Sequence, residues 1–572
     1  MPSSWVRASM LTRINSIIRG HSGVRVVVAG TIMSLLNHNL TPVVPLRGSI
    51  SASGDLSPLS YIAGAIEGSP DIYIRCADGT TKTADKALAD ARIEPVCLGA
   101  KEGLGLLNGT AFSAATATLA LHQAQDVAVL SQILTAMAVE AMQGSAESFS
   151  PEIAQMRPHP GQIESAANVL SYLDNSRLAR CVSGPKDTKM EGLYQDRYSL
   201  RTASQWIGPQ LEDLLHAHSQ LTIELNSTTD NPLIDVENEQ ILHGGNFQAA
   251  VVTSTMDRTR ICLERIGKIL FSQATELINP MLNNGLPANL CADNPSLSFT
   301  CKGIDINMAA YMSELSFLAS PVGNHVQSAE MHNQAINSLA LISSRYTIQA
   351  LDVVYLMCAA YLFAVCQALD LRVLQHMFLE AAEERVRTSM KMTFDGHLQH
   401  EEEVASKMFD IVWARINATW PTTTSADLNE RCKTTAESVL GDLVKLSAES
   451  TSPIPLAPRD IMAFTANLRV ELQGLYETSR DKMFSHHLAI TPSYLGDAAK
   501  RMYTFVRKDM GVGLHKGLIE HPTQPLPEGM LLDEVRKTIG TRISVIYEAL
   551  REGRASTVIM AIAEEGLEKR AQ

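Results

Sequence analysis

The triplet Ala52-Ser53-Gly54 holds the residue types most able to do chemistry without help from outside the chain. It lies in the run GSISASGD, which follows a proline-punctuated turn and is bracketed by Gly48 and Gly54. Glycines allow the backbone to fold tightly here. If the amide nitrogen of Gly54 reaches the carbonyl carbon of Ala52, a five-membered ring closes, and loss of water, including the Ser53 hydroxyl, leaves an exocyclic methylene. The triplet therefore predicts an imidazolone electrophile made from the chain itself, although Ala-Ser-Gly taken alone is more typical of a flexible turn.

The elements that must position this triplet are predicted to be helices. Apolar residues recur at helical spacing over residues 24–36 and again over residues 252–277, and the second stretch stops at Asn279-Pro280. Aromatic residues make up only 5% of the chain, and runs of period-two alternation are few. The pattern predicts an all-α fold built on long bundled helices.

Composition excludes several classes of protein. The 572 residues carry a net charge of −13 without a basic block, which argues against a nucleic-acid surface. Nine cysteines contain no CxxC pair, so neither a disulfide framework nor a zinc site is predicted, and no metal is expected. A reducing cytoplasm is the expected location.

One stretch raises the question of a membrane span. Residues 353–369 contain no charged residue, but this length is at the lower limit for a transmembrane helix. We expect a helix buried in the bundle, because core helices of large proteins are also apolar on all sides.

The amino-acid sequence around the triplet resembles that of a known family. GSISASGDLSPLSYIAGAIEG resembles the electrophile-forming segment of the aromatic amino acid ammonia-lyases, the family of histidine and phenylalanine ammonia-lyases. KEGLGLLNGTAFS, QDRYSLRTASQW, STTDNPLID, HGGNFQAA, CKGIDINMAAYMSEL and SAEMHNQAINSLALISSR follow in the family's order. The match runs from about residue 11 to about residue 345 and returns more weakly near the C-terminus, and it is closest to the fungal phenylalanine ammonia-lyases.

The resemblance implies an architecture. It is an all-α long-helix bundle of the histidine/phenylalanine ammonia-lyase type with an inserted helical domain, assembled as a homotetramer whose active sites take residues from three chains. The expected domains are residues 1–205, an electrophile-bearing catalytic domain that is N-terminally incomplete; 206–382, the central long-helix bundle; 383–500, an inserted helical domain of the shielding type; and 501–572, a C-terminal return to the core. Within the insertion, TWPTTTSAD and STSPIPLAPRD are predicted loops.

The resemblance also implies a reaction, that of a carbon–nitrogen lyase. L-Phenylalanine loses ammonia non-oxidatively and becomes trans-cinnamate. The 4-methylidene-imidazol-5-one formed autocatalytically from Ala52-Ser53-Gly54 activates the amine, and no external cofactor is required. A general base must also take a proton from the β-carbon.

Roles for single residues follow by carrying over the family's motifs. Besides the triplet, the expected catalytic residues are Asn108, Tyr198, Phe247 and Glu330. Tyr198 resembles the second catalytic tyrosine, Asn108 a residue that supports the electrophile's carbonyl, and Glu330 a carboxylate near the substrate amine. Phe247 resembles an aromatic packed beside the electrophile, with ordinary core packing as the alternative.

The expected substrate-binding residues are Arg201, Gln195, Asn231, Lys302, Gln334, Leu104, Leu107 and Ile306. Arg201 resembles a carboxylate clamp, for which a planar guanidinium is suited. Lys302 is expected to pair with Glu330 and tune its pKa. The three aliphatic residues are expected to wall the aryl pocket, and core packing explains them equally well.

Gln334 bears on the substrate. Histidine lyases carry Glu where this chain reads HNQ, and a neutral amide lacks the charge that an imidazole substrate would meet. The residue therefore favours an aryl substrate.

The sequence departs from the family at its beginning. The family's catalytic base is a tyrosine in a loop resembling YGxTGFG upstream of the electrophile, and no TGFG occurs in the printed sequence. We expect a chain shortened at its N-terminus. Tyrosine ammonia-lyase, phenylalanine aminomutase and a base-lacking, non-catalytic tetramer subunit remain as alternatives.

Overall fold

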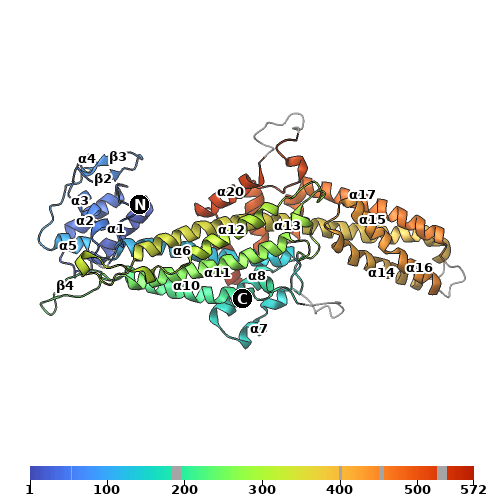
Figure 1. The fold of residues 1–572 in the computed structure, drawn as a ribbon, viewed down its shortest axis with the longest axis horizontal. Coiled ribbons are helices and arrows are strands. Elements are labelled where there is room, and N and C mark those ends of the chain that lie inside the picture. The colour runs from blue at the N-terminus through green and yellow to red at the C-terminus, as the bar shows by residue number, and fades with distance from the viewer. Residues whose placement is uncertain (53, 182–194, 399–401, 450–455, 525–536, 572) are drawn as a thin grey trace. The chain divides into compact units, whose positions relative to one another are not determined.

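A computed structural model describes residues 1–52, 54–181, 195–398, 402–449, 456–524 and 537–571 of the chain. Helices dominate these residues, as Figure 1 shows, which confirms the predicted all-α class. The chain divides into two compact units. Unit 1 comprises Met1–Ala128, Pro209–Gly267 and Ser313–Val354, and unit 2 comprises Val129–Gly208, Lys268–Met312 and Tyr355–Gln572.

Unit 1 contains the shorter N-terminal elements around one apolar core. Its elements are α1 (Ser3–Ile17), α2 (Val26–Asn37), β1 (Thr41–Pro42), α3 (Ser57–Ile66), β2 (Tyr73–Arg75), β3 (Thr81–Thr83), α4 (Ala84–Ala91), α5 (Glu102–Leu107), β4 (Leu233–Asp235), β5 (Gln240–Leu242), η3 (Gly323–His325) and η4 (Glu330–His332). The strands form an antiparallel sheet in the order β1-β2-β3 and a separate β4-β5 hairpin. Ile32 of α2, Ile62 of α3 and Ile74 of β2 are fully buried in the same cluster. Val44 and Leu59, on either side of the predicted electrophile segment, belong to the same core.

Five long helices contribute residues to both units. They are α6 (Ala111–Ala141), α10 (Ala203–Leu225), α11 (Ala250–Ile278), α12 (Lys302–Leu318) and α13 (Ala340–Leu398). The predicted apolar face of α11 is buried from Val252 to Leu277, and each buried aliphatic side chain contributes roughly 1.5–3 kcal/mol. The helix ends just before Asn279-Pro280, as the sequence predicts, because proline cannot continue the backbone hydrogen-bond ladder.

Polar bonds link these helices within each unit. In unit 1, Thr255 of α11 donates to Gln220 of α10 at 2.9 Å. In unit 2, Gln273 of α11 donates to Thr135 of α6 at 3.1 Å. Small hydroxyl residues such as these allow close helix packing and still satisfy buried polar groups.

The remaining elements belong to unit 2. They are η1 (Ala146–Phe149), α7 (Pro151–Met156), α8 (Pro160–Tyr172), α9 (Tyr198–Arg201), η2 (Ala288–Leu290), α14 (Glu402–Thr419), η5 (Trp420–Thr423), α15 (Leu428–Ser438), α16 (Leu440–Glu449), α17 (Pro458–Ile490), η6 (Thr491–Ser493), α18 (Asp497–Thr504), η7 (Phe505–Asp509), η8 (Leu518–Glu520), α20 (Ile539–Arg551) and α21 (Ser556–Ala571). Figure 1 shows α14 to α17 as a group of helices. Trp420 joins that group to α13, because its ring lies 4.4 Å from the ring of Phe378 and 5.7 Å from that of Tyr476.

The two predicted loops of the insertion have partly regular structure. TWPTTTSAD contains the 3-10 turn η5. Residues 450–455 of the second loop lie outside the described residues, and α17 already begins at Pro458, since proline is well suited to the first turn of a helix. The predicted division into four domains stays a prediction.

Two helical stretches are apolar enough to raise the membrane question. Glu102–Ala141 and Ala340–Phe394 pass a test of length and composition for a membrane span, but 78% of the apolar window in each is buried inside the protein. Residues 353–369 lie within α13, and all but the half-buried Leu356 are buried. This burial is what the sequence predicts for a core helix.

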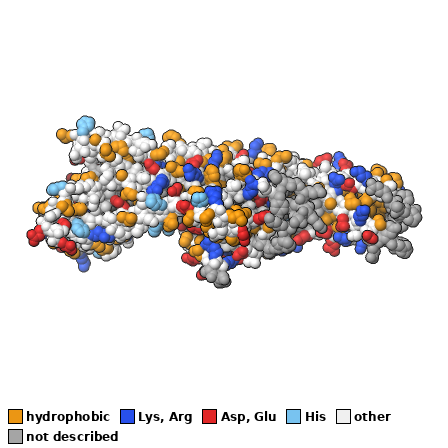
Figure 2. Space-filling model, turned by 90° about the horizontal axis from the view of Figure 1, so that it is seen from below, with side chains coloured by type: hydrophobic (Ala, Val, Ile, Leu, Met, Phe, Trp, Pro, Cys, Tyr) orange, Lys and Arg blue, Asp and Glu red, His pale blue; other side chains and the backbone are white. Residues whose placement is uncertain are grey.

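The surface agrees with the acidic composition. On the face drawn in Figure 2, acidic and basic side chains of the described residues are interspersed with hydrophobic ones, and no continuous basic area is seen among them.

Candidate active site

The predicted electrophile segment forms a tight turn in unit 1. Ala52 is buried with 1% of its surface exposed, and the amide of Asp55 donates to the Ala52 carbonyl at 3.2 Å. Gly54 has a φ of +83°, in the left-handed region that favours glycine. Ser53 lies outside the described residues. The described part of the turn therefore fits a segment that must bring Gly54 close to Ala52.

Asp55 holds the backbone on both sides of this turn. Its Oδ2 accepts hydrogen bonds from Ser49 Oγ at 2.6 Å, from the Ile50 amide at 2.8 Å and from the Ser51 amide at 3.2 Å. Its Oδ1 accepts the Ser57 amide, the first of α3, at 3.1 Å. Ser51 has a φ of +55°, a conformation that costs a non-glycine residue about 1–3 kcal/mol. The hydrogen bonds to the carboxylate offset this cost. The sequence analysis did not assign Asp55 a role, although its position directly after the triplet was a signal that it could hold the turn.

Glu330 and Gln334 lie beside the turn. A Cβ built on Gly54 would be 3.1 Å from Gln334 Nε2. The same amide donates to Glu330 Oε2 at 2.9 Å, and Asn333 Nδ2 donates to that oxygen at 3.0 Å. The structure thus brings three predicted site residues together, and any side chain at position 54 would press on Gln334.

Asn108 and Asn231 form a second predicted group in unit 1. Asn108 follows α5 and donates from Nδ2 to the Asn231 carbonyl at 3.3 Å. Its side chain is buried, and within the described residues its Oδ1 has no hydrogen-bond partner. Asn231 Oδ1 accepts the Gly244 amide at 2.8 Å, which ties it to the loop that carries the half-buried Phe247. The unsatisfied Asn108 oxygen is a buried polar group available to a neighbouring donor.

A buried charge cluster supports the loops of Asn108 and Asn231. Arg13 of α1 donates to the Thr229 carbonyl at 3.0 Å and also to the Gly105 carbonyl, and Lys101 Nζ lies 2.8 Å from Asp230 Oδ2. Burial lowers the pKa of Arg13 to about 10, and the charge of Asp230 opposes this. Burial raises the pKa of Asp230, and Lys101 and Arg13 oppose it. This cluster was missed from the sequence because its members come from three distant segments.

The aliphatic residues of α5 lie next to Asn108. Leu104 is 40% exposed, and Leu107 is half-buried against the unit 1 core. Gly109, just after Asn108, approaches the Thr229 carbonyl so closely that a Cβ would collide with it. The glycine therefore lets the two loops meet.

The other predicted residues lie in unit 2, and most of them are exposed. Tyr198 begins α9 with 71% of its surface exposed, and the Arg201 guanidinium lies 4.9 Å from the centre of the Tyr198 ring. Gln195 is exposed and lines a cavity of about 760 Å³ together with Glu276. This placement makes Tyr198 and Arg201 neighbours in unit 2.

Ser199, the residue after Tyr198, anchors α9. Ser199 Oγ donates to Glu276 Oε2 at 2.6 Å, and its carbonyl accepts Gln273 Nε2 at 2.9 Å. Burial raises the pKa of Glu276, and the bond from Ser199 opposes that rise. Both partners lie on α11, so this helix fixes the short helix α9.

Lys302 and Ile306 lie on α12. Lys302 Nζ is 4.6 Å from the centre of the Phe299 ring, a cation–π contact, and Ile306 is 65% exposed. Lys302 belongs to unit 2 and Glu330 to unit 1. Their expected pairing therefore stays a prediction.

With this fold and this site, the chain belongs to the aromatic amino acid lyase family, whose sequence model matches residues 1–391. It is accordingly an enzyme, a carbon–nitrogen lyase, as the motifs predict.

The chain is also similar to individual members of this family. The chain is 49% identical to the phenylalanine ammonia-lyase lenB of Aspergillus lentulus, over 97% of this chain and 77% of that protein. It is 47% identical to a phenylalanine aminomutase (L-β-phenylalanine forming) of Talaromyces islandicus, over 98% of this chain and 78% of that protein. Among solved structures, phenylalanine ammonia-lyase from Rhodosporidium toruloides matches with a TM-score of 0.90 and 43% identity, over 98% of this chain and 83% of that one.

Proposed function

We propose that this enzyme removes ammonia from L-phenylalanine without oxidation and releases trans-cinnamate. The observation that carries the proposal is the turn at Ala52–Gly54 with Gln334 and Glu330 beside it. The high identity to phenylalanine ammonia-lyases supports the substrate. Gln334 is neutral, which suits an aryl ring better than an imidazole.

We further propose that Ala52, Ser53 and Gly54 form a 4-methylidene-imidazol-5-one. This group supplies an electrophilic methylene that makes the substrate amine a better leaving group. The left-handed φ of Gly54 and the four bonds accepted by Asp55 support the proposal, because they hold the turn tight before any ring exists. No external cofactor forms part of the proposal.

The polar residues of unit 1 are proposed to hold the reacting end of the substrate. Glu330 binds the substrate amine, since its carboxylate already accepts hydrogen bonds from two amides and its negative charge attracts a further donor. Asn108 is proposed to donate its second amide N–H to the electrophile's carbonyl, and its burial with the first N–H on the Asn231 carbonyl supports a fixed position for this donor. Asn231 orients Asn108, and Phe247 covers the site from the following loop.

The residues of unit 2 are proposed to hold the carboxylate and the ring. Arg201 binds the carboxylate through its planar fork, with Tyr198 stacked near it and Gln195 as a polar neighbour. Lys302 adds positive charge. Ile306 of unit 2 and, from unit 1, Leu104 and Leu107 are proposed to wall the aryl pocket, and their partly exposed apolar side chains support this role.

The exposure of Tyr198 and Ile306 supports a further part of the proposal, a homotetramer with shared active sites. Exposed residues with apolar surface are typical of sites completed by another chain. We propose a cytoplasmic location and the four-domain organisation on the same family grounds.

A second candidate function is phenylalanine aminomutase, in which ammonia returns to the β-carbon. The 47% identity to a named aminomutase favours it specifically. A β-amino acid product would distinguish it from the lyase.

The test is to incubate the purified protein with L-phenylalanine and with L-tyrosine in parallel and to separate the products by liquid chromatography with mass detection. Trans-cinnamate and ammonia in equal amounts would support the lyase. Coumarate would show that the substrate is L-tyrosine, and β-phenylalanine would show that the reaction is that of an aminomutase. A folded protein that gives no product would overturn the proposal.

A further inference from the structure

The segment that carries Glu330 and Gln334 has an unusual backbone. Glu330, Met331 and His332 have φ values of +48°, +53° and +68°, and Leu339 has a φ of +52°. Side-chain-bearing residues avoid this region, and three in succession persist only where the surroundings impose them. Two backbone bonds between Ala329 and Gln334, at 3.1 and 3.2 Å, close the loop on itself. A further bond inside the segment runs from Asn337 Nδ2 to the Gln327 carbonyl at 2.7 Å. Because the loop is otherwise largely exposed, its attachment to the rest of unit 1 depends mainly on its two ends.

Both ends are held by one face of α11. Asp257 Oδ2 accepts the amides of Val322 and Gly323, each at 3.1 Å. One turn earlier, the Thr253 hydroxyl donates to the Ser338 carbonyl. Residues four apart on a helix lie on the same face. The entrance and the exit of the segment 322–338 are therefore fixed to neighbouring turns of a single helix.

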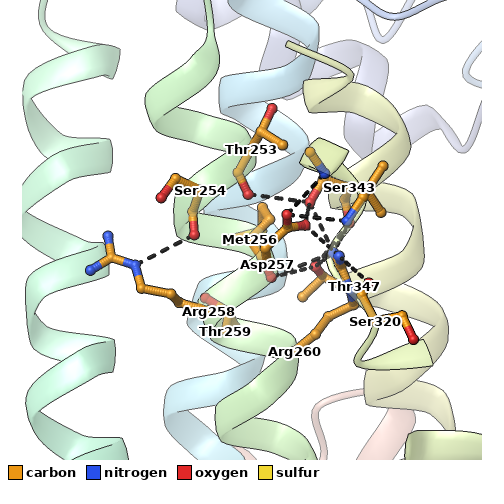
Figure 3. A network of polar contacts seen from close by, with 12 residues as sticks. Thr253, Ser254, Met256, Asp257, Arg258, Thr259, Arg260, Ser320, Ser343 and Thr347 are labelled. Atoms are coloured by element: carbon orange, nitrogen blue, oxygen red, sulfur yellow. Dashed lines mark hydrogen bonds and ion pairs between the residues drawn. The ribbon is translucent and has the colours of Figure 1, made fainter. Parts of the chain in front are cut away.

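Arg260 completes this anchor, as Figure 3 shows. Its guanidinium is fully buried, pairs with Asp257, and donates to the Leu318 carbonyl at 2.9 Å and the Ser320 carbonyl at 3.3 Å. It also donates to the Ser343 carbonyl and hydroxyl, both at 2.8 Å. Ser343 Oγ in turn donates to Asp257 Oδ1 at 2.7 Å. One cation thus holds the end of α12 and the first turns of α13, which lie on either side of the loop.

A buried ion pair is costly to desolvate unless its partners satisfy it, so apolar side chains would stabilise the helix packing equally well. The Asp257–Arg260 pair differs from an apolar contact because its hydrogen bonds go to particular backbone groups that flank the loop. Hydrogen bonds of this kind fix the chain to a particular place, whereas apolar packing tolerates small shifts.

We propose that Thr253, Asp257 and Arg260 are positioning residues for Glu330 and Gln334. They act through the segment 322–338 and take no part in the reaction themselves. The inference rests on the proposed function for its catalytic consequence. Because Gln334 lies against Gly54, a shift of the loop changes how the site meets the substituents of an aryl ring.

The first test measures the loop directly. We would compare hydrogen–deuterium exchange in peptides covering residues 324–337 for the wild type, Asp257→Asn and Thr253→Val. Loss of a hydrogen bond to a charged group is expected to speed exchange in Asp257→Asn by roughly ten- to a hundredfold, and loss of a neutral one in Thr253→Val by roughly three- to tenfold. Peptides covering residues 49–55 should not change.

Thr259→Val is the matched control. Thr259 is equally buried on α11, and its hydroxyl donates only to the Thr255 carbonyl of its own helix, at 2.8 Å. The control should leave loop exchange unchanged. Thr253→Ser keeps the hydroxyl and should restore wild-type exchange. Equal acceleration in the control, or acceleration throughout α11 as well as the loop, would overturn the proposal.

The second test measures selectivity. The ratio of kcat/KM for L-phenylalanine to that for para-fluoro-L-phenylalanine should change about threefold or more in Asp257→Asn and Thr253→Val, and stay constant in Thr259→Val. A merely structural role would lower both values in proportion and leave the ratio fixed, which would overturn the proposal. If the wild type gives no product, the proposed function fails, while the exchange data still decide whether α11 positions the loop.

Discussion

The two units present their predicted site residues in different ways. In unit 1, Gly54, Gln334 and Glu330 are connected to one another, and the bonds of Asp55 and Asp257 reach the backbone around them. In unit 2, Tyr198 is 71% exposed, and the half-buried Arg201 contacts its ring. A fully buried ion pair of unit 2 lies elsewhere, in its helical scaffold.

The scaffold network centres on Asp370 of α13. Its carboxylate accepts Arg507 Nη2 at 2.8 Å, Thr491 Oγ1 at 2.7 Å and the Tyr503 hydroxyl, and both charged side chains are fully buried. These bonds join η6, α18 and η7 to α13. The comparison teaches that unit 1 uses buried charge to fix the loops of the candidate site, whereas unit 2 uses it to hold helices together. Mutations in the two networks should therefore fail in different ways.

The largest effect is expected for Ser53→Ala in unit 1. Without the serine hydroxyl no methylene can form, so turnover of L-phenylalanine should fall below detection. The thermal unfolding midpoint should stay near that of the wild type. Product formation at an undiminished rate would refute the electrophile assignment.

Next comes Asp370→Asn in unit 2. The change leaves the Arg507 cation buried without its counter-charge, and breaking such a pair costs about 3–5 kcal/mol. We expect a clear fall in the thermal unfolding midpoint, with ring formation retained at low temperature. Asp90→Asn, which removes the exposed pair with Lys82, is the control and should leave the midpoint unchanged. An unaltered midpoint in Asp370→Asn would break the comparison.

Glu140 gives the unit 2 scaffold a dependence on pH. Burial raises its pKa to about 7, although hydrogen bonds from Ser176 Oγ and the Gly496 amide, both 2.6 Å, oppose the rise. Because the folded pKa exceeds the unfolded one, the stabilisation is complete below about pH 4.5 and is lost as pH rises through about 7.

Glu140→Gln removes this titration. Between about pH 4.5 and pH 8 the wild type should lose roughly 3 kcal/mol of unfolding free energy relative to the variant. Thermal unfolding midpoints measured across that range check the prediction. Parallel curves for the two proteins would show that the pKa of Glu140 does not change on folding.

The smallest of these effects is expected for Arg201→Lys. The charge is kept, but the two-pronged contact with a carboxylate is lost, which is worth about 1.5–3 kcal/mol, or roughly 10- to 100-fold in kcat/KM. Steady-state kinetics with L-phenylalanine should show the loss mainly in KM. Arg19→Lys, at an exposed position, is the control. Equal kinetic constants for Arg201→Lys and the wild type would refute the proposed role of Arg201 in binding the substrate carboxylate.

The helices were the most predictable part of the molecule. The apolar period of α11 and its stop before Pro280 are local properties, so they could be read from neighbouring residues. The motif QDRYSLR likewise holds Tyr198 and Arg201 three positions apart, which brings them together on one helical turn.

The network around Arg260 was not predictable in the same way. Its partners on α12 and α13 are about 60 to 90 residues away, and no local pattern records which of them it meets. The available signal was a charged pair, Asp257 and Arg260, on the face that also carries the buried Met256 and Leu263. Charged residues are seldom buried unless they are paired, and this rule would have singled them out.

The most direct test of the central claim is the mass of the tryptic peptide that spans residues 48–75, measured in the wild type and in Ser53→Ala. Ring formation removes one water at closure and one from the Ser53 hydroxyl. We predict a wild-type peptide lighter than its sequence by two waters, and a variant without that loss. An unmodified wild-type peptide in a protein that still converts L-phenylalanine to trans-cinnamate would contradict the account.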